Sequence, residues 1–248
     1  MQFKPALDLV VSALEEIRER SETLPSASRA SLASLWERPA EVGRNKMQIL
    51  AELQDRVSRC LLCPHLASSR TQTVFGVGNV DADVMFIGEA PGADEDAQGE
   101  PFVGRAGQLL TKIIAAMGFT RSDVYIANIL KCRPDTPGAS SGNRPPTIGE
   151  MQTCLPYLAT QIDVVRPKVL VALGATAVEG LLGFRKTMRE LRGTWHAYQE
   201  TPLMITYHPS YLLRNQLNTE KRKVWEDMLL VLERLERPIT EKQRNYFL

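Results

Sequence analysis

The sequence predicts an α/β fold: a three-layer α/β/α sandwich with a central, mostly parallel sheet of four strands. Two observations predict it. Four short apolar runs of strand length alternate with helical stretches of ten or more residues, which is the pattern of parallel strands joined by crossover helices. Glycine and polar residues follow each apolar run at once, as they do where parallel strands end and binding sites gather.

The four expected strands are apolar runs at residues 84–87, 124–129, 169–173 and 203–206. Amphipathic spacing predicts helices at residues 104–117, 147–165, 175–182 and 221–235, and a further helix over 46–59 that leads directly to Cys60. These elements define a main domain that we expect to span residues 51–237. Residues 238–248 are then expected to form a C-terminal tail.

The first 50 residues differ from the rest of the chain. Residues 5–20 place Leu7, Val10, Leu14 and Ile17 at helical spacing, whereas residues 21–45 are rich in Ser, Ala, Glu and Pro. We therefore expect residues 1–50 to form an N-terminal helix and a flexible linker. This helical extension is a candidate binding segment for a protein partner.

Bulk composition limits the classes of function. The chain has 248 residues, 44% of them hydrophobic, and a formal net charge of +1, so any nucleic-acid binding depends on a local basic patch. The longest apolar run is too short for a membrane span, and Glu15 and Glu16 interrupt any signal-like N-terminus. We expect a cytoplasmic protein that does not enter a membrane.

Four cysteines are arranged as metal ligands. Cys60 and Cys63 form a C-x2-C pair, and Cys132 and Cys154 flank a loop rich in proline and glycine. In a cytoplasmic protein such thiolates bind metal more often than they form disulfides. The spacing leaves both a zinc site and an iron–sulfur cluster open, although scattered third and fourth ligands suit a [4Fe–4S] cluster somewhat better.

The strand ends carry the other unusual residues. Gly88-Glu89-Ala90-Pro91-Gly92 follows the first strand and leads to Pro101-Phe102-Val103-Gly104, and Asn128-Ile129-Leu130-Lys131-Cys132-Arg133-Pro134 follows the second. Gly174-Ala175-Thr176 and His208-Pro209-Ser210 follow the third and fourth. Amide, imidazole and carboxylate groups therefore meet at one edge of the predicted sheet, which predicts a functional site there.

These motifs, their order and the four cysteines resemble the family 4 uracil-DNA glycosylases, an iron–sulfur branch of the uracil-DNA glycosylase superfamily. The resemblance covers about residues 56–235 and excludes the N-terminal 50. It implies that the main domain is a glycosylase domain with a [4Fe–4S] cluster held by the four cysteines. It also implies hydrolysis of the N-glycosidic bond of deoxyuridine in single- or double-stranded DNA, which leaves an abasic site in base excision repair. We expect a monomeric, nucleoid-associated enzyme.

The chemistry of such a reaction gives roles to individual residues. His208 suits donation to uracil as it leaves as an anion, and the Asn128 amide suits the uracil edge. Phe102 can stack on the flipped base. The backbone of Gly88 and Ala90 is expected to add contacts.

Two acids are the candidates for the water step. Other branches of the superfamily have Asp where this chain has Ala90, so the water-activating residue is not given by position. Glu89 is expected to shape the pocket, and Glu95 to face the water or the sugar. Asp94, Asp96 and Glu100 are interpreted as solvated loop charges.

DNA contacts are expected from two regions. Arg105 opens a helix whose amides can receive a phosphate, and Ser210 and Arg214 follow His208, with Tyr211, Leu212 and Leu213 as candidates for a wedge into the duplex. Lys131, Arg133 and Arg144 are candidates for a second basic patch.

Two other classes of function stay open. A non-catalytic iron–sulfur DNA-binding protein of the same fold is favoured by Ala90 and by the long loop 135–146, and would bind uracil-containing DNA without cutting it. A zinc-stabilised α/β hydrolase of a small molecule would be colourless, whereas an iron–sulfur protein is brown.

Overall fold

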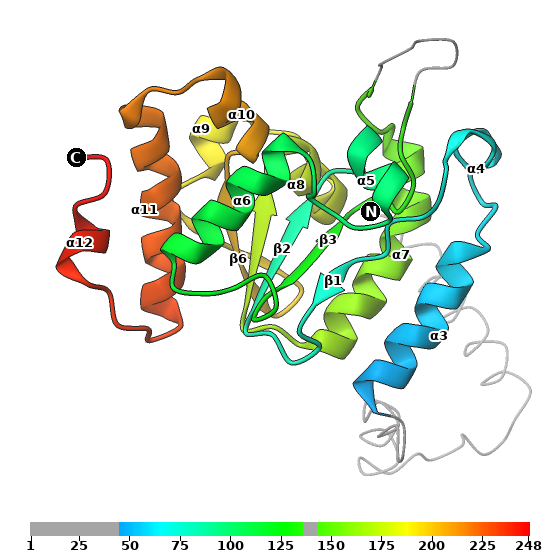
Figure 1. Ribbon diagram of the computed structural model, residues 1–248, viewed down its shortest axis with the longest axis horizontal. Coiled ribbons are helices and arrows are strands. Elements are labelled where there is room, and N and C mark those ends of the chain that lie inside the picture. The colour runs from blue at the N-terminus through cyan, green and yellow to red at the C-terminus, as the bar shows by residue number, and fades with distance from the viewer. Residues whose placement is uncertain (1–44, 136–142) are drawn as a thin grey trace, which may run out of the picture. The chain divides into compact units, whose positions relative to one another are not determined.

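Four parallel strands form the centre of the sheet, as the sequence predicted. The computed structural model describes residues 45–135 and 143–248, so the predictions for the first 44 residues lie outside the described residues. The central strands lie in the order β3-β2-β4-β6 (Figure 1). Their bounds are β2 (Val84–Gly88), β3 (Tyr125–Asn128), β4 (Val169–Leu173) and β6 (Thr201–Thr206). The register pairs Gly88 with Asn128 and Leu173 with Thr206, so neighbouring strands end level with each other.

Two short edge strands complete the sheet, and the sequence did not predict them. Strands β1 (Val77–Gly78) and β5 (Trp195–Tyr198) pair antiparallel with β3 and β6, which gives a six-stranded order β1-β3-β2-β4-β6-β5. β1 has only two residues, and most of β5 is partly exposed. Neither strand therefore produces the continuous apolar run by which buried parallel strands are recognised.

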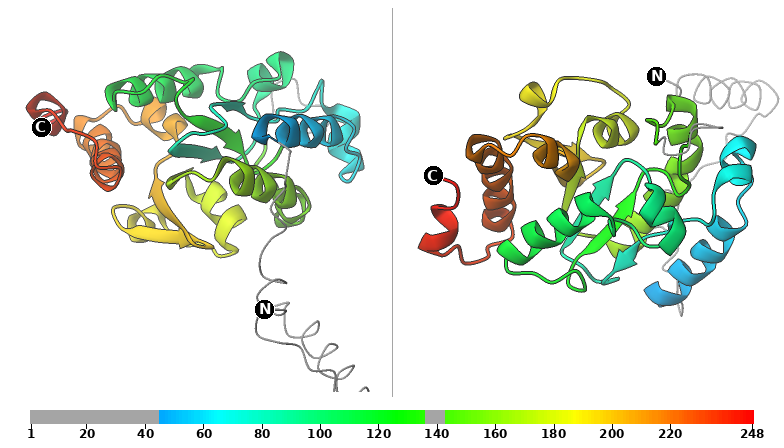
Figure 2. Two further views of the ribbon diagram at one scale, coloured as in Figure 1. Left: turned by 90° about the horizontal axis from the view of Figure 1, so that it is seen from below. Right: turned by 45° about the horizontal axis from the view of Figure 1, so that its top comes forward.

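Helices cover both faces of the sheet, which confirms the three-layer architecture (Figure 2). Successive strand side chains point to opposite faces. Met85 and Ile87 of β2 pack in the core that contains side chains of α3 (Lys46–Ser58), α7 (Ile148–Val165) and α8 (Ala175–Leu182). Val84 and Phe86 pack in the core that contains side chains of α6 (Arg105–Ala116) and α11 (Asn218–Arg234).

Capping explains where two of the predicted helices begin. Asn45 and Thr147 precede α3 and α7. The side chain of each accepts the backbone N–H of the third helical residue, and the side chain of that third residue accepts the backbone N–H of the capping residue. Helix α11 begins at Asn218, earlier than predicted. Its first turn is highly polar, so apolar periodicity alone did not show where it starts.

The described residues also form five short helices between or after the longer elements: α4 (Pro64–Ser69), α5 (Ala93–Gln98), α9 (Met188–Leu191), α10 (Pro209–Arg214) and α12 (Glu241–Arg244). They are too short to produce a periodic pattern. α5 explains the acidic run after β2, because Asp94, Glu95 and Asp96 occupy its first turn, where the helix dipole favours negative charge. Asp96 is buried and accepts the Thr71 N–H at 2.9 Å, so its interpretation as a solvated charge was wrong.

Residues 238–248, expected to be a tail, pack against the domain. Gln243 of α12 donates to the Ala116 carbonyl at 2.8 Å, and Tyr246 lies 5.1 Å from the Trp225 ring. These contacts place the C-terminal residues against α6 and α11. Within the described residues, no helix combines the length and the apolar character needed to cross a membrane.

Candidate active site

A cavity of about 530 Å³ opens at the carboxyl ends of the central strands. Its lining comes from the loops that follow β2, β3, β4 and β6, as the sequence predicted for this edge of the sheet. The members with candidate roles are Glu89, Ala90, Glu95, Phe102, Asn128, Arg144, Thr176, His208, Ser210 and Arg214.

His208 is the residue before α10, and its ring is held by the turn that it caps. Nδ1 lies 2.8 Å from Ser210 Oγ and accepts the Ser210 backbone N–H at 3.1 Å, which assigns the proton of the neutral ring to Nε2. Burial, together with the charge of Arg214, lowers the pKa of His208 to about 4. At neutral pH the side chain is therefore an uncharged hydrogen-bond donor.

Gly174 allows His208 to take this position. A Cβ on Gly174 would lie 3.0 Å from the His208 Cβ, and the backbone of Gly174 has a φ of +93°, which side-chain-bearing residues rarely adopt. The Gly174 N–H also donates to the Thr206 carbonyl at 2.9 Å. The glycine after β4 thus brings the two loops together.

Asn128 ends β3 and its side chain lies in the floor of the cavity. The residue is only 2% exposed, and its Oδ1 is a buried acceptor without a hydrogen-bond partner among the described residues. Such an atom costs free energy unless a ligand or water supplies a donor. A Cβ on Gly88 would lie 2.4 Å from this Oδ1 and 2.5 Å from the Phe102 ring, so only glycine fits beneath both.

Phe102 is fixed by an unusual backbone conformation. Its φ is +56°, and its ring is buried with its centroid 5.7 Å from that of His208. Arg121 donates to the carbonyls of Pro101 and Phe102 at 2.8 and 3.1 Å. No sequence pattern indicated a role for Arg121, because that role depends on a loop distant in the chain.

Glu95 holds the same loop from the other side. Its carboxylate accepts the N–H groups of Gly92, Val103 and Gly104, each at 3.0 Å. Both oxygens are therefore engaged with the backbone, although the residue lines the cavity. This geometry favours a positioning role over the water- or sugar-directed role that the sequence predicted.

Glu89 is the other cavity acid, and its environment differs. Burial raises the pKa of Glu89, and a hydrogen bond with Thr176 acts in the opposite direction. Thr176 lies in the first turn of α8, and no role for it was predicted from the sequence. The pair places a carboxyl group and a hydroxyl group at the cavity wall beside Ala90.

The residues expected to bind DNA separate into two groups. Ser210 and Arg214 line the cavity, and Arg105 is exposed at the start of α6. Tyr211 instead stacks on Tyr207 with centroids 4.4 Å apart and donates to Glu220 at 2.9 Å. Leu212 is 5% exposed and is not part of the cavity lining, which contradicts its expected role as an exposed wedge.

The four cysteines line one small cavity, although they come from distant parts of the chain. Arg70 and the Lys131 backbone N–H donate to the sulfurs of Cys132 and Cys154 at 3.1 and 3.3 Å. Burial raises the pKa of Cys132 and raises that of Cys154 to about 11. Among the described residues, no three His, Cys, Asp or Glu side chains are grouped around the position of a single metal ion.

The predicted second basic patch is wrong for Lys131, which is buried. Lys131 is 1% exposed and donates to the Asn128 carbonyl at 2.9 Å and to Gln161 at 2.6 Å. Arg144 pairs with buried Glu150. Lys131 thus supports the backbone of a cavity residue from behind, a role that its sequence neighbours did not indicate.

The fold and the site define a class of protein: an α/β domain with a polar cavity at the carboxyl ends of its strands and a second, smaller cavity lined by four cysteines. The Uracil DNA glycosylase superfamily profile matches residues 75–229. A type-4 uracil-DNA glycosylase of Thermotoga maritima is 42% identical over 185 residues, 73% of this chain and 92% of the relative. One from Archaeoglobus fulgidus is 39% identical over 183 residues, 70% of this chain and 88% of the relative.

The chain therefore belongs to the uracil-DNA glycosylase superfamily and, within it, to the type-4 uracil-DNA glycosylases. The resemblance inferred from the strand-end motifs is confirmed.

Proposed function

We propose that the cavity receives a uracil base extruded from DNA and that this chain hydrolyses its N-glycosidic bond, leaving an abasic site for repair. Membership in the type-4 family supports the reaction. The single observation that supports this substrate is Asn128 Oδ1, a buried acceptor without a hydrogen-bond partner among the described residues, which the N3–H of uracil would satisfy.

Asn128 would also give specificity. Cytosine has an unprotonated N3 at the corresponding position, so it would leave the Asn128 acceptor unpaired. A buried polar group left unpaired costs about 1–3 kcal/mol. Phe102 would contribute a ring face for stacking on either pyrimidine, so stacking supports affinity and the amide supports discrimination. The backbone of Gly88 and Ala90 would add further contacts: Ala90 lines the cavity, and Gly88 lies directly beside the Asn128 amide and the Phe102 ring.

His208 would stabilise the leaving group. As the bond between sugar and base breaks, negative charge develops on the uracil oxygens, and a fixed N–H donor stabilises that charge. The Nε2 proton of the neutral ring suits this role, because the Ser210 N–H fixes the tautomer. The group needs no proton transfer to act.

Glu89 is the proposed catalytic carboxylate. A positively charged sugar and an attacking water both gain from a nearby acid, and a raised pKa brings a carboxyl group closer to the range of a general base. Glu95 is proposed to act through the loop that it holds, because both its oxygens accept backbone N–H groups.

Arg105, Ser210 and Arg214 are proposed to contact DNA phosphates. Tyr211 would support this loop through Tyr207.

We further propose that Cys60, Cys63, Cys132 and Cys154 hold a [4Fe–4S] cluster. In such a cluster each cysteine binds a different iron, which suits four thiols around a cavity better than a single tetrahedral zinc ion. When bound, the cluster would supply bonds that fasten α3, α4 and α7 together. The N–H donors from Arg70 and Lys131 would stabilise its sulfur charge.

A uracil-cutting assay tests the function. The purified protein should release uracil from a labelled oligonucleotide, which alkali then cuts at the abasic site. His208→Ala should reduce the single-turnover rate by about 10²–10³-fold, as loss of one oxyanion donor does. Binding without cutting by the native protein would instead support the non-catalytic iron–sulfur protein.

We propose a cytoplasmic, nucleoid-associated monomer, with the N-terminal extension as the segment for a protein partner.

A further inference from the structure

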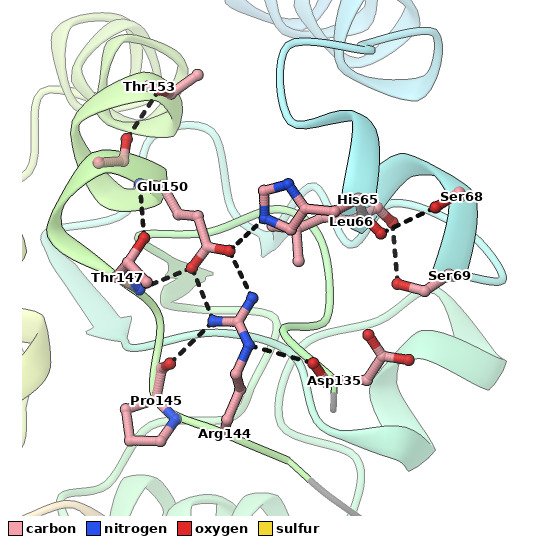
Figure 3. Close-up of polar contacts among 11 residues, drawn as sticks. His65, Leu66, Ser68, Ser69, Asp135, Arg144, Pro145, Thr147, Glu150 and Thr153 are labelled. Carbon is pink, nitrogen blue, oxygen red and sulfur yellow. Dashed lines mark hydrogen bonds and ion pairs between the residues drawn. The ribbon is translucent and has the colours of Figure 1, made fainter. Parts of the chain in front are cut away.

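A buried carboxylate joins the cysteine-bearing segments to the wall of the base cavity. Figure 3 shows Glu150 at the centre of a polar cluster that also contains His65, Arg144 and Thr147. These residues come from α4, from the segment after the long loop, and from the start of α7. We call them the Glu150 cluster.

The contacts of Glu150 go far beyond helix capping. Thr147 N–H donates to Oε2 at 2.7 Å, which completes the capping box of α7. Arg144 adds a bidentate pair, with Nη1 at 2.9 Å from Oε2 and Nη2 at 2.6 Å from Oε1. His65 Nε2 lies 2.6 Å from the same Oε1. Arg144 and His65 thus share one carboxylate oxygen.

The charge of Glu150 makes these contacts energetically important. The side chain is 4% exposed, and the bonds from Arg144 lower the pKa of Glu150 to about 2, so it is ionised at neutral pH. Removing one partner of a buried ion pair leaves a charge without compensation. Glu150 keeps its other contacts when one partner is lost, but fewer groups then determine where its carboxylate lies.

Arg144 connects the Glu150 carboxylate to the wall of the base cavity. Asn143, Arg144 and Pro145 all line the cavity, and Arg144 also donates to the carbonyls of Asp135 and Pro145 at 3.2 and 3.1 Å. The guanidinium therefore makes two hydrogen bonds to the backbone beside the wall and two to the Glu150 carboxylate. Its position depends on where the Glu150 carboxylate sits.

His65 and Glu150 connect the cluster to the cysteine-bearing segments. His65 follows Cys63 by two residues at the start of α4, and it does not line the base cavity. Glu150 and Cys154 are four residues apart in α7, so they share one face of the helix. A displacement of the α4 segment would therefore reach the cavity wall through one shared oxygen atom.

We propose that Glu150 is a positioning residue that couples the α4 segment to the base cavity, so that His65 affects the affinity for uracil-containing DNA through Arg144. The proposal rests on the proposed function, since it assigns the cavity to the extruded base.

A double-mutant cycle tests the coupling. The variants are His65→Gln, Arg144→Lys and the double variant; lysine cannot form the bidentate pair but keeps the charge. Steady-state kcat and KM are measured on a uracil-containing oligonucleotide, and Kd is measured separately on the abasic product by fluorescence anisotropy. Visible absorbance and the midpoint of thermal unfolding show whether each variant is folded and retains its metal centre. Glu190→Gln is the matched control, because Glu190 also occupies the third position of a capping box but lies outside the cavity lining.

The expected result is that His65→Gln changes KM in the native protein but hardly changes it in the Arg144→Lys variant. His65→Gln should raise KM and Kd by about threefold to tenfold with kcat nearly unchanged, the size of effect found for residues that share a partner. In the Arg144→Lys background the same change should have less than about a twofold effect. Equal effects in both backgrounds, or an unchanged KM in His65→Gln, would overturn the coupling. A native protein that binds but does not cut would instead overturn the proposed function.

Discussion

The hydrogen bond from the Ser210 backbone N–H determines which nitrogen of the His208 ring can donate to a ligand. The Ser210 N–H occupies Nδ1, and burial disfavours the charged ring, so the imidazole presents an Nε2 proton without a positive charge. A charged ring would also attract the leaving anion, but it would repel Arg214 and lose its solvation. The neutral donor is the form that this environment stabilises.

The first prediction concerns the protonation of His208. Its pKa is lowered to about 4, whereas an unfolded histidine titrates near pH 6.5. The neutral ring therefore contributes stability that is fully present above about pH 6.5 and is lost as the pH falls toward about 4. In NMR spectra the His208 ring signal should stay unchanged between about pH 8 and about pH 5. The chain has three histidines, so single variants assign every signal. A midpoint near the ordinary value for His208 would contradict the burial argument.

At the scale of elements, short loops are held by backbone hydrogen bonds to side chains from elsewhere. The loop with Phe102 receives Glu95 of α5 on one side and Arg121, beyond α6, on the other. These bonds maintain a left-handed backbone at Phe102, a conformation that costs about 1–3 kcal/mol in a residue with a side chain.

The second prediction removes one of these supports. Glu95→Ala leaves three N–H groups without their acceptor, so we expect a loss of about 1–3 kcal/mol in the free energy of unfolding. The rate of uracil excision should fall further, because Phe102 loses its fixed position. Urea denaturation and single-turnover kinetics measure the two effects. Asp94→Ala is the control, since Asp94 is exposed in the same helical turn. A variant with unchanged stability but no excision would show that Glu95 acts on the chemistry directly.

The sequence predicted most of the elements and the residues of the cavity, because both leave local patterns. Buried parallel strands produce apolar runs, and the polar residues that follow them meet at one edge of the sheet, as Glu89, Asn128 and His208 do. Edge strand β5 and the supports Arg121 and Lys131 were missed. Their roles depend on partners that are distant in the chain, and a single sequence does not reveal such pairs. Leu212 was misinterpreted because a leucine in a short helix looks the same whether it faces DNA or the core.

At the scale of the molecule, the cysteine site and the base cavity lie on two sides of the same segment. Lys131 donates its backbone N–H to Cys154 and its side chain to the Asn128 carbonyl. α7 contributes Cys154 to the cysteine site, and its Gln161 accepts a hydrogen bond from the Lys131 side chain. The integrity of the four-cysteine site should therefore affect both the stability of the fold and the floor of the cavity.

The last prediction follows from this arrangement. Cys60→Ser removes one ligand of the proposed [4Fe–4S] cluster, and since metal binding is coupled to folding, the variant should lose iron, brown colour and stability together. Excision should weaken as well, because the segment from Asn128 to Cys132 is no longer held. Iron analysis, visible absorbance, urea denaturation and the cutting assay follow the four properties. Leu61→Ser is the control, because Leu61 lies between the paired cysteines and is 70% exposed. A colourless Cys60→Ser protein with native stability and full excision would rule out a structural cluster, and would leave the raised thiol pKa values of Cys132 and Cys154 as properties of an ordinary buried core.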